Sequence, residues 1–436
     1  MSPAHEHPVV VVGAGLAGLA CATALHREGV PVRVMEASDG VGGRVRTDHV
    51  DGFTLDRGFQ VMLTAYPELH RQFDVAALDL REFAPGALVW RNGRGSAVVD
   101  PFRDPRHAVA TALAPIGSPF DKLRIARLRH SLRSVHPALL LAGDDRSTAA
   151  TLADRGFSDT MIERFFRPLV GGIQLDPELQ ASRRMFDIVF RMLADGAAAV
   201  PAAGMAAVPE QLAAHLPDGT IELGAPVSAV RTGMDGAAIE VDGQHHVSAR
   251  AVVVATDGPV AGELLGIAPV GSKSVGCVYF AAHAAPTDTK MVVLDGARSG
   301  PVLNVAVMSN VAPEYAPAGS HLVVAAMPGE TGEQLESSAR RQLRGWWGAQ
   351  VDRWQHLRTY RIPHGQPSQD PPFRPKQRVS LGHGLFVCGD HRDTASIQGA
   401  LYSGRRCADA VLAHLDVARD VADPPTAHRP DGEPAS

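Results

Sequence analysis

Apolar residues near the start of the chain follow two different periods. Val9 to Val12 is an uninterrupted apolar run, the pattern of a strand buried on both faces. Apolar residues then recur at helical spacing from Leu16 to Ala24, and the pattern stops at Gly29, which suits a helix C-terminus. A second apolar run, Val32 to Met35, ends on Glu36. The pattern predicts a strand, a helix and a second strand, as in a parallel sheet.

Later apolar runs predict where this sheet resumes and where a second sheet lies. Residues 220–247 hold short strands separated by Gly, Pro and Asp turns, which suggests a meander, and 250–256 is a further buried strand. A short strand at 385–387 precedes a C-terminal helix. The second sheet and its helix are expected at 89–99 (a hairpin), 275–280, 302–308, 321–327 and 335–347.

The stretch 121–143 reads as an amphipathic helix. Ile125, Leu128, Leu132 and Val135 fall on one face, with several arginines nearby. A basic amphipathic helix can lie on an anionic membrane. The alternative is a surface helix whose apolar face packs inward, and we favour that interpretation.

The sequence between the first strand and the first helix is rich in glycine. Gly13 permits a tight turn, Gly15 lets the backbone approach a pyrophosphate, and Gly18 lets the helix sit close to the sheet. The helix N-terminus offers N–H groups to phosphates. Glu36 can accept hydrogen bonds from ribose hydroxyls, and its charge disfavours a 2′-phosphate. The motif predicts a dinucleotide site, with a nucleotide-free doubly wound fold as the alternative.

A second glycine motif, Gly40-Val41-Gly42-Gly43-Arg44, follows Glu36. Its arginine can make charge-assisted bonds to phosphate. With the first motif, it resembles the flavin-containing amine oxidase superfamily, which includes amine oxidases, protoporphyrinogen oxidases and phytoene-type desaturases. The resemblance implies FAD as the cofactor. Because 354–372 contains no cysteine, we expect FAD to be held non-covalently.

Three further segments carry the resemblance. Residues 56–60 resemble the segment that passes near the flavin ring, and Val227 matches a valine beside the adenine. Residues 384–415 resemble the C-terminal FAD signature, in which a helix N-terminus faces the pyrimidine end of the flavin and stabilises its negative charge on reduction. The implied cofactor contacts are Gly13, Ala14, Gly15, Leu16, Ala17, Gly18, Glu36, Ala37, Gly42, Gly43, Arg44, Gly58, Phe59, Gln60, Val227, Gly389, Asp390, Ile397, Gln398, Gly399 and Ala400.

The resemblance covers nearly the whole chain and implies an α/β protein of two domains. The FAD-binding domain is of Rossmann type, a parallel sheet plus a β-meander, and is discontinuous. A second, α+β domain covers the substrate. Residues 417–436 have few apolar residues and many Pro and Asp, and we expect them to be disordered. The expected FAD-binding segments are 1–75, 205–260 and 377–416, and the substrate-binding segments are 76–204 and 261–376.

Composition narrows the class of protein. The 436 residues are 45% hydrophobic and carry a net charge of −5, which gives no bulk electrostatic reason to bind nucleic acid. Cys21, Cys277, Cys388 and Cys407 show no metal-ligand or C-x-x-C spacing and suggest reduced, buried thiols in a cytosolic protein. The sequence shows no signal peptide and no apolar run long enough to span a bilayer. We therefore expect a cytoplasmic protein without a metal, for which peripheral membrane contact stays open.

The resemblance implies hydride transfer from a substrate carbon to flavin N5. Amine oxidases of this superfamily typically carry a lysine near N5 and an aromatic cage. Here Ser274 or Gly276 falls at the lysine position, with Lys273 displaced, and Ser396 or Ile397 falls at the cage tyrosine. These departures favour C–C dehydrogenation of an apolar small molecule over amine oxidation.

Several alternatives stay open at this point. A flavin-binding protein without turnover and a Rossmann protein that uses NAD are both compatible with the motifs. The electron acceptor is oxygen, a quinone or another protein, and the oligomeric state is not predicted. No catalytic acid or base is assigned: His364, His391, Arg167 and Asp187 are candidates by region only, and a structural or solvated role suits each of them.

Overall fold

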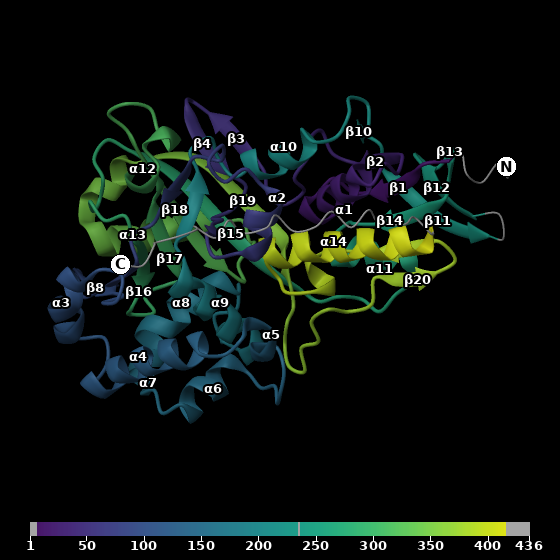
Figure 1. Cartoon of the computed structure of the whole chain (residues 1–436). Coiled ribbons are helices and arrows are strands. Elements are labelled where there is room, and N and C mark those ends of the chain that lie inside the picture. The colour runs from purple at the N-terminus through teal and green to yellow at the C-terminus, as the bar shows by residue number, and fades with distance from the viewer. Residues whose placement is uncertain (1–6, 234–235, 416–436) are drawn as a thin grey trace, which may run out of the picture.

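The computed structural model describes residues 7–233 and 236–415. A six-stranded and a seven-stranded sheet lie at opposite ends of the molecule, and the helices between α3 and α9 form a lobe beside the larger sheet (Figure 1). The expected disorder of 417–436 concerns residues outside the described part of the chain.

The six-stranded sheet is assembled from three separated segments. Its neighbouring strands are parallel, except that the last strand is antiparallel to its neighbour. Both faces of the central strands are buried, as their continuous apolar runs predict. In spatial order the strands are β10 (Ile221–Leu223), β2 (Val32–Glu36), β1 (Val9–Val12), β14 (Ala251–Val254), β21 (Leu385–Val387) and β20 (Ser380–Gly382).

Two different layers cover this sheet. Val9 and Val11 point into the core shared with the helices on one face, and Val10 and Val12 into the core shared with a meander on the other. The helical layer contains α1 (Leu16–Arg27), α10 (Ala207–Ala213) and α14 (Ile397–His414), and α14 lies along α1 (Figure 1). The opposite layer contains β11 (Val227–Gly233), β12 (Gly236–Val241), β13 (His245–Ala249) and α11 (Gly258–Leu265).

One strand of the expected meander lies elsewhere. The sequence analysis placed 220–223 in the meander, but β10 pairs in parallel with β2 at the edge of the six-stranded sheet. Only β11, β12 and β13 form the antiparallel meander. The pattern of short strands was correct, whereas the pairing partner of such a short strand is set by tertiary contacts.

The seven-stranded sheet is antiparallel except where β16 runs parallel to β7. Cys277 and Tyr279 face the core that includes α1 and α14, whereas Val278 and Phe280 face α13 (Leu335–Trp347). The order is β19 (Gln355–Pro367), β15 (Ser272–Ala282), β18 (His321–Pro328), β17 (Asn304–Val307), β16 (Val292–Asp295), β7 (Gly86–Arg91) and β8 (Arg94–Val99).

The helical lobe contains the predicted amphipathic helix in shorter form. Helix α4 spans Pro119–Arg133, and the next helix begins only at Pro137 because the residue before a proline is driven out of helical conformation. Leu128 and Leu132 are buried, which confirms the interpretation that this apolar face packs inward. The other helices of the lobe are α3 (Ala108–Leu113), α5 (Pro137–Leu140), α6 (Thr148–Asp154), α7 (Asp159–Met161), α8 (Arg167–Ile173) and α9 (Arg183–Asp195).

The remaining elements are short. Most of them lie in segments that join the two large sheets, whereas α12 joins β17 to β18 within the larger sheet. None of the helices within 7–233 and 236–415 combines the length and apolar character needed to cross a bilayer. The connecting elements are β3 (Thr47–Val50), β4 (Phe53–Asp56), β5 (Met62–Leu63), α2 (Pro67–Gln72), β6 (Leu80–Glu82), β9 (Ala198–Pro201) and α12 (Met308–Val311).

A buried carboxylate, Asp56, ties these connections together. Its Oδ1 accepts hydrogen bonds from the Thr47 hydroxyl at 2.7 Å and the Met205 N–H at 2.8 Å. Its Oδ2 accepts from the Tyr315 hydroxyl at 2.9 Å. Burial raises the pKa of Asp56 to about 6, although these bonds oppose the shift.

The Asp56→Asn variant is expected to be at least as stable as the wild type above pH 7. A pKa of about 6 in the folded state exceeds the ordinary value, so keeping the carboxylate ionised costs the folded protein roughly 3 kcal/mol. The variant avoids this cost but loses part of the energy of the hydrogen bonds. Wild type regains this stability as pH falls from about 6 to about 4, because the folded protein then takes up the proton first. The midpoint of thermal unfolding of Asp56→Asn should therefore exceed that of wild type by more at pH 8 than at pH 5.

Asp218→Asn, at an exposed position, is the matched control and should show no such pH dependence. A difference between Asp56→Asn and wild type that is constant from pH 8 to pH 5 would contradict a raised pKa at Asp56.

Candidate cofactor site

The first glycine loop leaves open space at one position and none at two others. Gly13 has φ +104°, and a Cβ there would lie 3.0 Å from the Ala255 carbonyl oxygen. A Cβ at Gly18 would lie 2.0 Å from the Gly13 carbonyl oxygen. Gly15 has ordinary extended backbone, and its Cβ would meet nothing within 4 Å. The loop therefore requires glycine at Gly13 and Gly18 to fold, and Gly15 leaves an approach to the N-terminus of α1.

Glu36 lies at the end of β2 and reaches back to this loop. Its Oε2 accepts from the Ala14 N–H at 2.7 Å, and its Oε1 accepts from the N–H and hydroxyl of Ser38. The Ala225 N–H donates to the Glu36 carbonyl at 2.9 Å, which brings Val227, the first residue of β11, beside the end of β2. The structure thus brings Glu36 and Val227 to one edge of the site, and leaves Ala37 exposed there.

The second glycine motif packs directly on the first. The Gly42 N–H donates to the Ala14 carbonyl at 2.8 Å, and Gly15 and Gly42 form a parallel bridge. A Cβ at Gly42 would lie 2.2 Å from the Val45 carbonyl, and one at Gly43 would lie 3.4 Å from the Gly15 Cα. Leu16 and Ala17 are buried in the adjacent first turn of α1. The two motifs therefore form one backbone cradle at the start of α1.

Arg44 connects this cradle to two distant segments. Its guanidinium donates to Asp390 Oδ1 at 2.7 Å and to the Gly365 carbonyl at 2.9 Å. The Gln60 amide donates to the Arg44 carbonyl at 2.7 Å, whereas Gln60 Oε1 is buried without a partner among the described residues. Gly365 was not predicted as part of the site, because nothing in the local sequence marks a carbonyl as the partner of Arg44.

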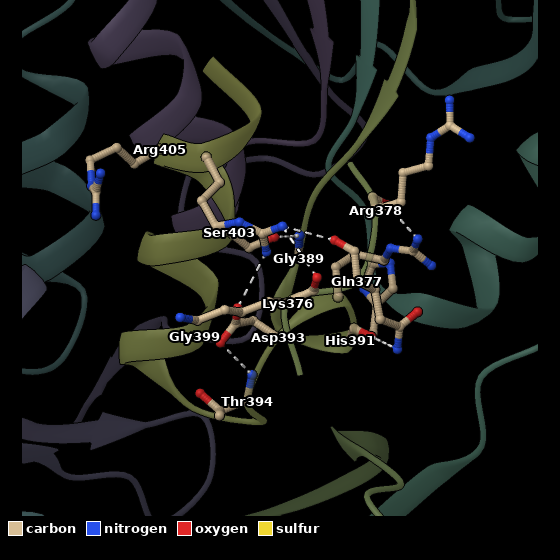
Figure 2. Close-up of polar contacts among 12 residues, drawn as sticks. Lys376, Gln377, Arg378, Gly389, His391, Asp393, Thr394, Gly399, Ser403 and Arg405 are labelled. Atoms are coloured by element: carbon tan, nitrogen blue, oxygen red, sulfur yellow. Dashed lines mark hydrogen bonds and ion pairs between the residues drawn. The ribbon is translucent and has the colours of Figure 1, made fainter. Parts of the chain in front are cut away.

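The C-terminal motif folds back onto α14 (Figure 2). Gly389, at φ +148°, donates its N–H to the Ser403 hydroxyl at 3.1 Å, and Gln377 donates to the His391 carbonyl at 3.3 Å. The His391 ring lies over Gly389, where a Cβ would come within 2.5 Å of it. Both ring nitrogens are buried without a partner in the described chain, and burial lowers the pKa of His391 to about 4. His391 is therefore neutral near pH 7.

The N-terminus of α14 completes the site. Ser396 caps the helix by accepting from the Gly399 N–H at 3.0 Å. Gln398 Oε1 accepts from the Glu68 N–H at 2.9 Å, so the Gln398 side chain holds α2 and only its backbone faces the site. Ile397 and Ala400 are partly buried against the core that contains α1.

The segment 56–60 is pinned against the larger sheet. The Phe59 N–H donates to Cys277 Sγ at 3.3 Å, and the Tyr279 hydroxyl contacts the carbonyls of Asp56 and Gly58 at 2.8 and 3.1 Å. Gly58 adopts φ +106°. Strand β15 therefore positions the predicted residues Gly58, Phe59 and Gln60 relative to the cradle.

Three of the candidates for acid or base chemistry carry structural contacts instead. Arg167 is paired with Glu163 at 2.6 Å, and Asp187 with Arg155 at 2.8 Å. His364 is exposed and contacts the Ser272 hydroxyl at 2.8 Å. These contacts support the structural interpretation of each side chain.

Gly276, one of the two residues expected at the amine-oxidase lysine position, faces away from the cradle. A Cβ there would lie 2.6 Å from the Leu335 side chain of α13, on the face of β15 turned away from the cradle. Side chains alternate along a strand, and Val275, Cys277 and Tyr279 face the core that contains α1, so Gly276 faces α13. Lys273 instead lines a small cavity between β15, β19, α8 and α9. No aromatic residue lines this cavity.

The residues present fit FAD. The glycine cradle needs backbone without Cβ atoms and leaves Gly15 open. Buried polar atoms of His391 and Gln60 have no protein partner among the described residues. This is expected of atoms that face a bound ligand. Two helix N-termini and Arg44 supply the positive electrostatics that a diphosphate requires.

Comparisons with known proteins agree with this geometry. The sequence profile described as "Flavin containing amine oxidoreductase" matches residues 16–412. The chain is 29% identical over 293 residues to a phytoene dehydrogenase of Streptomyces griseus, covering 60% of this chain and 56% of that protein. It is 30% identical over 175 residues to a coproporphyrinogen III oxidase of Propionibacterium freudenreichii subsp. freudenreichii, covering 39% and 32%.

Solved structures share the fold. The structure of cyclohexylamine oxidase from Brevibacterium oxydans IH-35A matches with a TM-score of 0.71 at 17% identity, covering 94% of this chain and 99% of that one. The matches to the two curated relatives named above span about half or less of their length. The extent of the profile match, together with the glycine cradle, shows that the chain belongs to the flavin-containing amine oxidoreductase family, a family of FAD-dependent oxidoreductases.

Proposed function

We propose that the protein dehydrogenates a carbon–carbon bond of an apolar small molecule. The observation that carries this proposal is the lack of amine-oxidase features near β15 and α14: Gly276 faces α13, and the residues expected at the cage tyrosine, Ser396 and Ile397, are not aromatic. No aromatic ring lines the cavity of about 10 Å³ beside the N-terminus of α14 either. Its lysine, Lys273, lies 3.2 Å from Asp370 and 3.9 Å from Asp176. A charged lysine held by carboxylates is poorly suited to the role expected of the amine-oxidase lysine. Bound FAD supplies the hydride acceptor.

The same proposal assigns the cofactor contacts. The glycine cradle holds the diphosphate, and Glu36 accepts hydrogen bonds from the adenosine ribose. Arg44 and Asp390 lie along the path between diphosphate and flavin, and the first turn of α14 stabilises negative charge at the pyrimidine end of the reduced ring. The proposal also keeps the division into FAD-binding segments (1–75, 205–260, 377–416) and substrate-binding segments (76–204, 261–376).

Gly15→Val tests the cradle without disturbing the fold. Since a Cβ at Gly15 meets nothing within 4 Å, the variant should fold normally, with a cost limited to helix capping. The valine would occupy the approach to the diphosphate, and we expect FAD affinity to fall by roughly 100-fold or more. The dissociation constant is measured by flavin fluorescence, and folding by circular dichroism of the apoprotein.

Gly345→Val is the matched control, because Gly345 also has nothing within 4 Å of its Cβ position but lies in α13. It should keep wild-type FAD affinity. Full FAD affinity in a folded Gly15→Val protein would contradict the assigned diphosphate position.

Anaerobic reduction separates the two reactions. We expect the visible absorbance of the oxidised flavin to bleach with a polyene precursor or a porphyrinogen, and to persist with a panel of primary and secondary amines. Bleaching by amines alone would replace C–C dehydrogenation with amine oxidation. FAD that stays oxidised with every compound would indicate a flavin-binding protein without turnover. Re-oxidation by oxygen or by a quinone then identifies the acceptor.

We also propose that the lobe touches an anionic lipid surface, from which an apolar substrate could enter. Most large apolar side chains left exposed by the described residues lie between 102 and 139. On α4, Phe120 and Leu123 are 69% and 66% exposed, and Arg127 follows on the same helical face. On α3, Leu113 is 78% exposed, and Lys122 ties the two helices by donating to carbonyls at the end of α3. This face is opposite to the buried Leu128 and Leu132.

Replacing Phe120 and Leu123 by serine tests this contact. Burial of each side chain in lipid contributes roughly 1.5–3 kcal/mol to binding. The double variant should therefore lose most co-sedimentation with phosphatidylcholine vesicles that contain phosphatidylglycerol. Leu223→Ser, at a 47% exposed leucine of β10, is the control and should bind like wild type. Wild-type protein that stays in the supernatant with these vesicles would contradict the proposal.

A further inference from the structure

A groove of about 380 Å³ lies on the face of the larger sheet that is turned away from the cofactor site. It runs between α13, the turn that joins β7 to β8, and the 297–301 loop. Helix α13 packs on the side of β15 opposite to the core that contains α1, and lies far from α1 in the molecule (Figure 1). Small-molecule sites measure roughly 300–1,000 Å³, so the groove has room for a ligand that does not touch the cofactor.

One face of α13 forms a wall of this groove. Gln342 and Trp346 tie this wall to the 297–301 loop and its neighbour: the Trp346 indole N–H donates to the Ser299 hydroxyl at 3.0 Å, and the Gln342 amide donates to the Val302 carbonyl at 2.8 Å. The wall is therefore fixed by hydrogen bonds that leave the groove open. Its residues are spaced by three and four positions, which places them on one side of the helix: Ser338, Arg341, Gln342, Gly345 and Trp346.

The opposite wall is the tight turn between β7 and β8. Arg91 and Arg94 pair across the turn, and Asn92 and Gly93 adopt φ of +50° and +71°. Positive φ at both central residues is typical of two-residue hairpin turns, whose geometry is well defined. The turn thus holds the end of β7, with Trp90 and Arg91, in the lining of the groove. The Trp90 Nε1–H is buried and has no partner in the described chain.

The groove carries positive charge that the described residues do not neutralise. Arg91 and Arg341 both line it, and neither side chain forms an ion pair within 7–233 and 236–415. The charge of Arg91 is felt nearby: burial, and then the proximity of Arg91, lower the pKa of Arg164. Arginine binds phosphate and carboxylate groups through charge-assisted, often paired, hydrogen bonds. Two unpaired arginines in one groove therefore favour an anionic ligand.

The nearest buried carboxylate does not offset this charge in the groove. Among the described residues, no aspartate or glutamate is part of the lining. Asp295 is buried behind it, and its oxygens accept from the Gln342 amide at 2.9 Å and from the N–H groups of Ala297 and Ser299 at 2.9 and 2.6 Å. The carboxylate is thus used to hold the 297–301 loop against α13.

We propose that this groove binds a small anionic molecule that carries a phosphate or carboxylate group and a flat ring. Arg91 and Arg341 bind the anionic group, and the side chains of Trp90 and Trp346 in the lining give the ring an aromatic surface. Because the groove and the cradle lie on opposite faces of the larger sheet, this ligand and FAD bind at the same time.

Isothermal titration calorimetry on the FAD-loaded protein tests the proposal with 1-naphthyl phosphate, 1-naphthoate and inorganic phosphate. Wild type should bind at least one of the two ring-bearing anions roughly tenfold or more tightly than inorganic phosphate, and the tighter of the two identifies the anionic group. Inorganic phosphate that binds as tightly as both would indicate an adventitious ion only and would overturn the proposal. Failure of both ring-bearing anions to bind also overturns it.

Two variants test the location. Arg91→Ala and Arg341→Ala should each weaken binding of the preferred anion roughly tenfold, because each removes a charge-assisted contact. Arg353→Ala is the matched control, since it removes an exposed arginine outside the lining, and it should bind like wild type. An affinity that either groove variant leaves unchanged, or an equal loss in Arg353→Ala, overturns the proposal.

The flavin spectrum separates this site from the cofactor site. It should stay constant while the anion binds, and a spectral shift that accompanies binding would place the anion at the flavin and overturn the proposal. These readouts do not depend on turnover. If no substrate reduces the flavin but binding depends on Arg91 and Arg341, the proposed reaction fails and the anion site stands.

Discussion

Close approach of backbone around the start of α1 is the constraint on which the rest of the structure depends. A Cβ at Gly18 would meet the Gly13 carbonyl at 2.0 Å, and one at Gly404 would meet the Ala17 carbonyl at 2.2 Å. The first contact sets the turn from β1 into α1, and the second seats α14 against α1. Because α14 is held there, the 389–400 segment reaches the same place as the two N-terminal glycine motifs, although more than 340 residues separate Arg44 from Asp390.

The larger sheet has a second role beyond covering the site. Strand β15 presents Cys277 and Tyr279 to the 56–60 segment, and β19 presents the Gly365 carbonyl to Arg44. The cradle is therefore held between two sheets and not by the parallel sheet alone. The buried Asp56 lies where these contacts meet, which explains why a carboxylate with a raised pKa is retained: its three hydrogen bonds join β3, the start of α10 and the segment before β18.

The sequence predicted the features that depend on local conformation. Gly13, Gly18 and Gly42 reflect backbone geometry or close contact at their own positions, and the strands and helices around them follow from apolar periodicity. The sequence did not predict which residues from distant segments of the chain contact one another. The Arg44–Gly365 bond spans 321 residues, and β10 is too short to specify its partner.

The cavity bears on why members of one fold oxidise different bonds. In the proposed assignment, the glycine cradle contacts parts of the cofactor common to every reaction, so it carries no information about the substrate. In the proposed function, specificity comes from the walls contributed by α8, α9, β15 and β19. Here those walls combine a lysine paired with carboxylates and aliphatic side chains. A cation pays a large desolvation cost when it enters a pocket of aliphatic side chains, whereas a neutral apolar molecule loses little on entry. In the proposed function, the balance of these two desolvation costs, more than the fold, favours C–C dehydrogenation over amine oxidation.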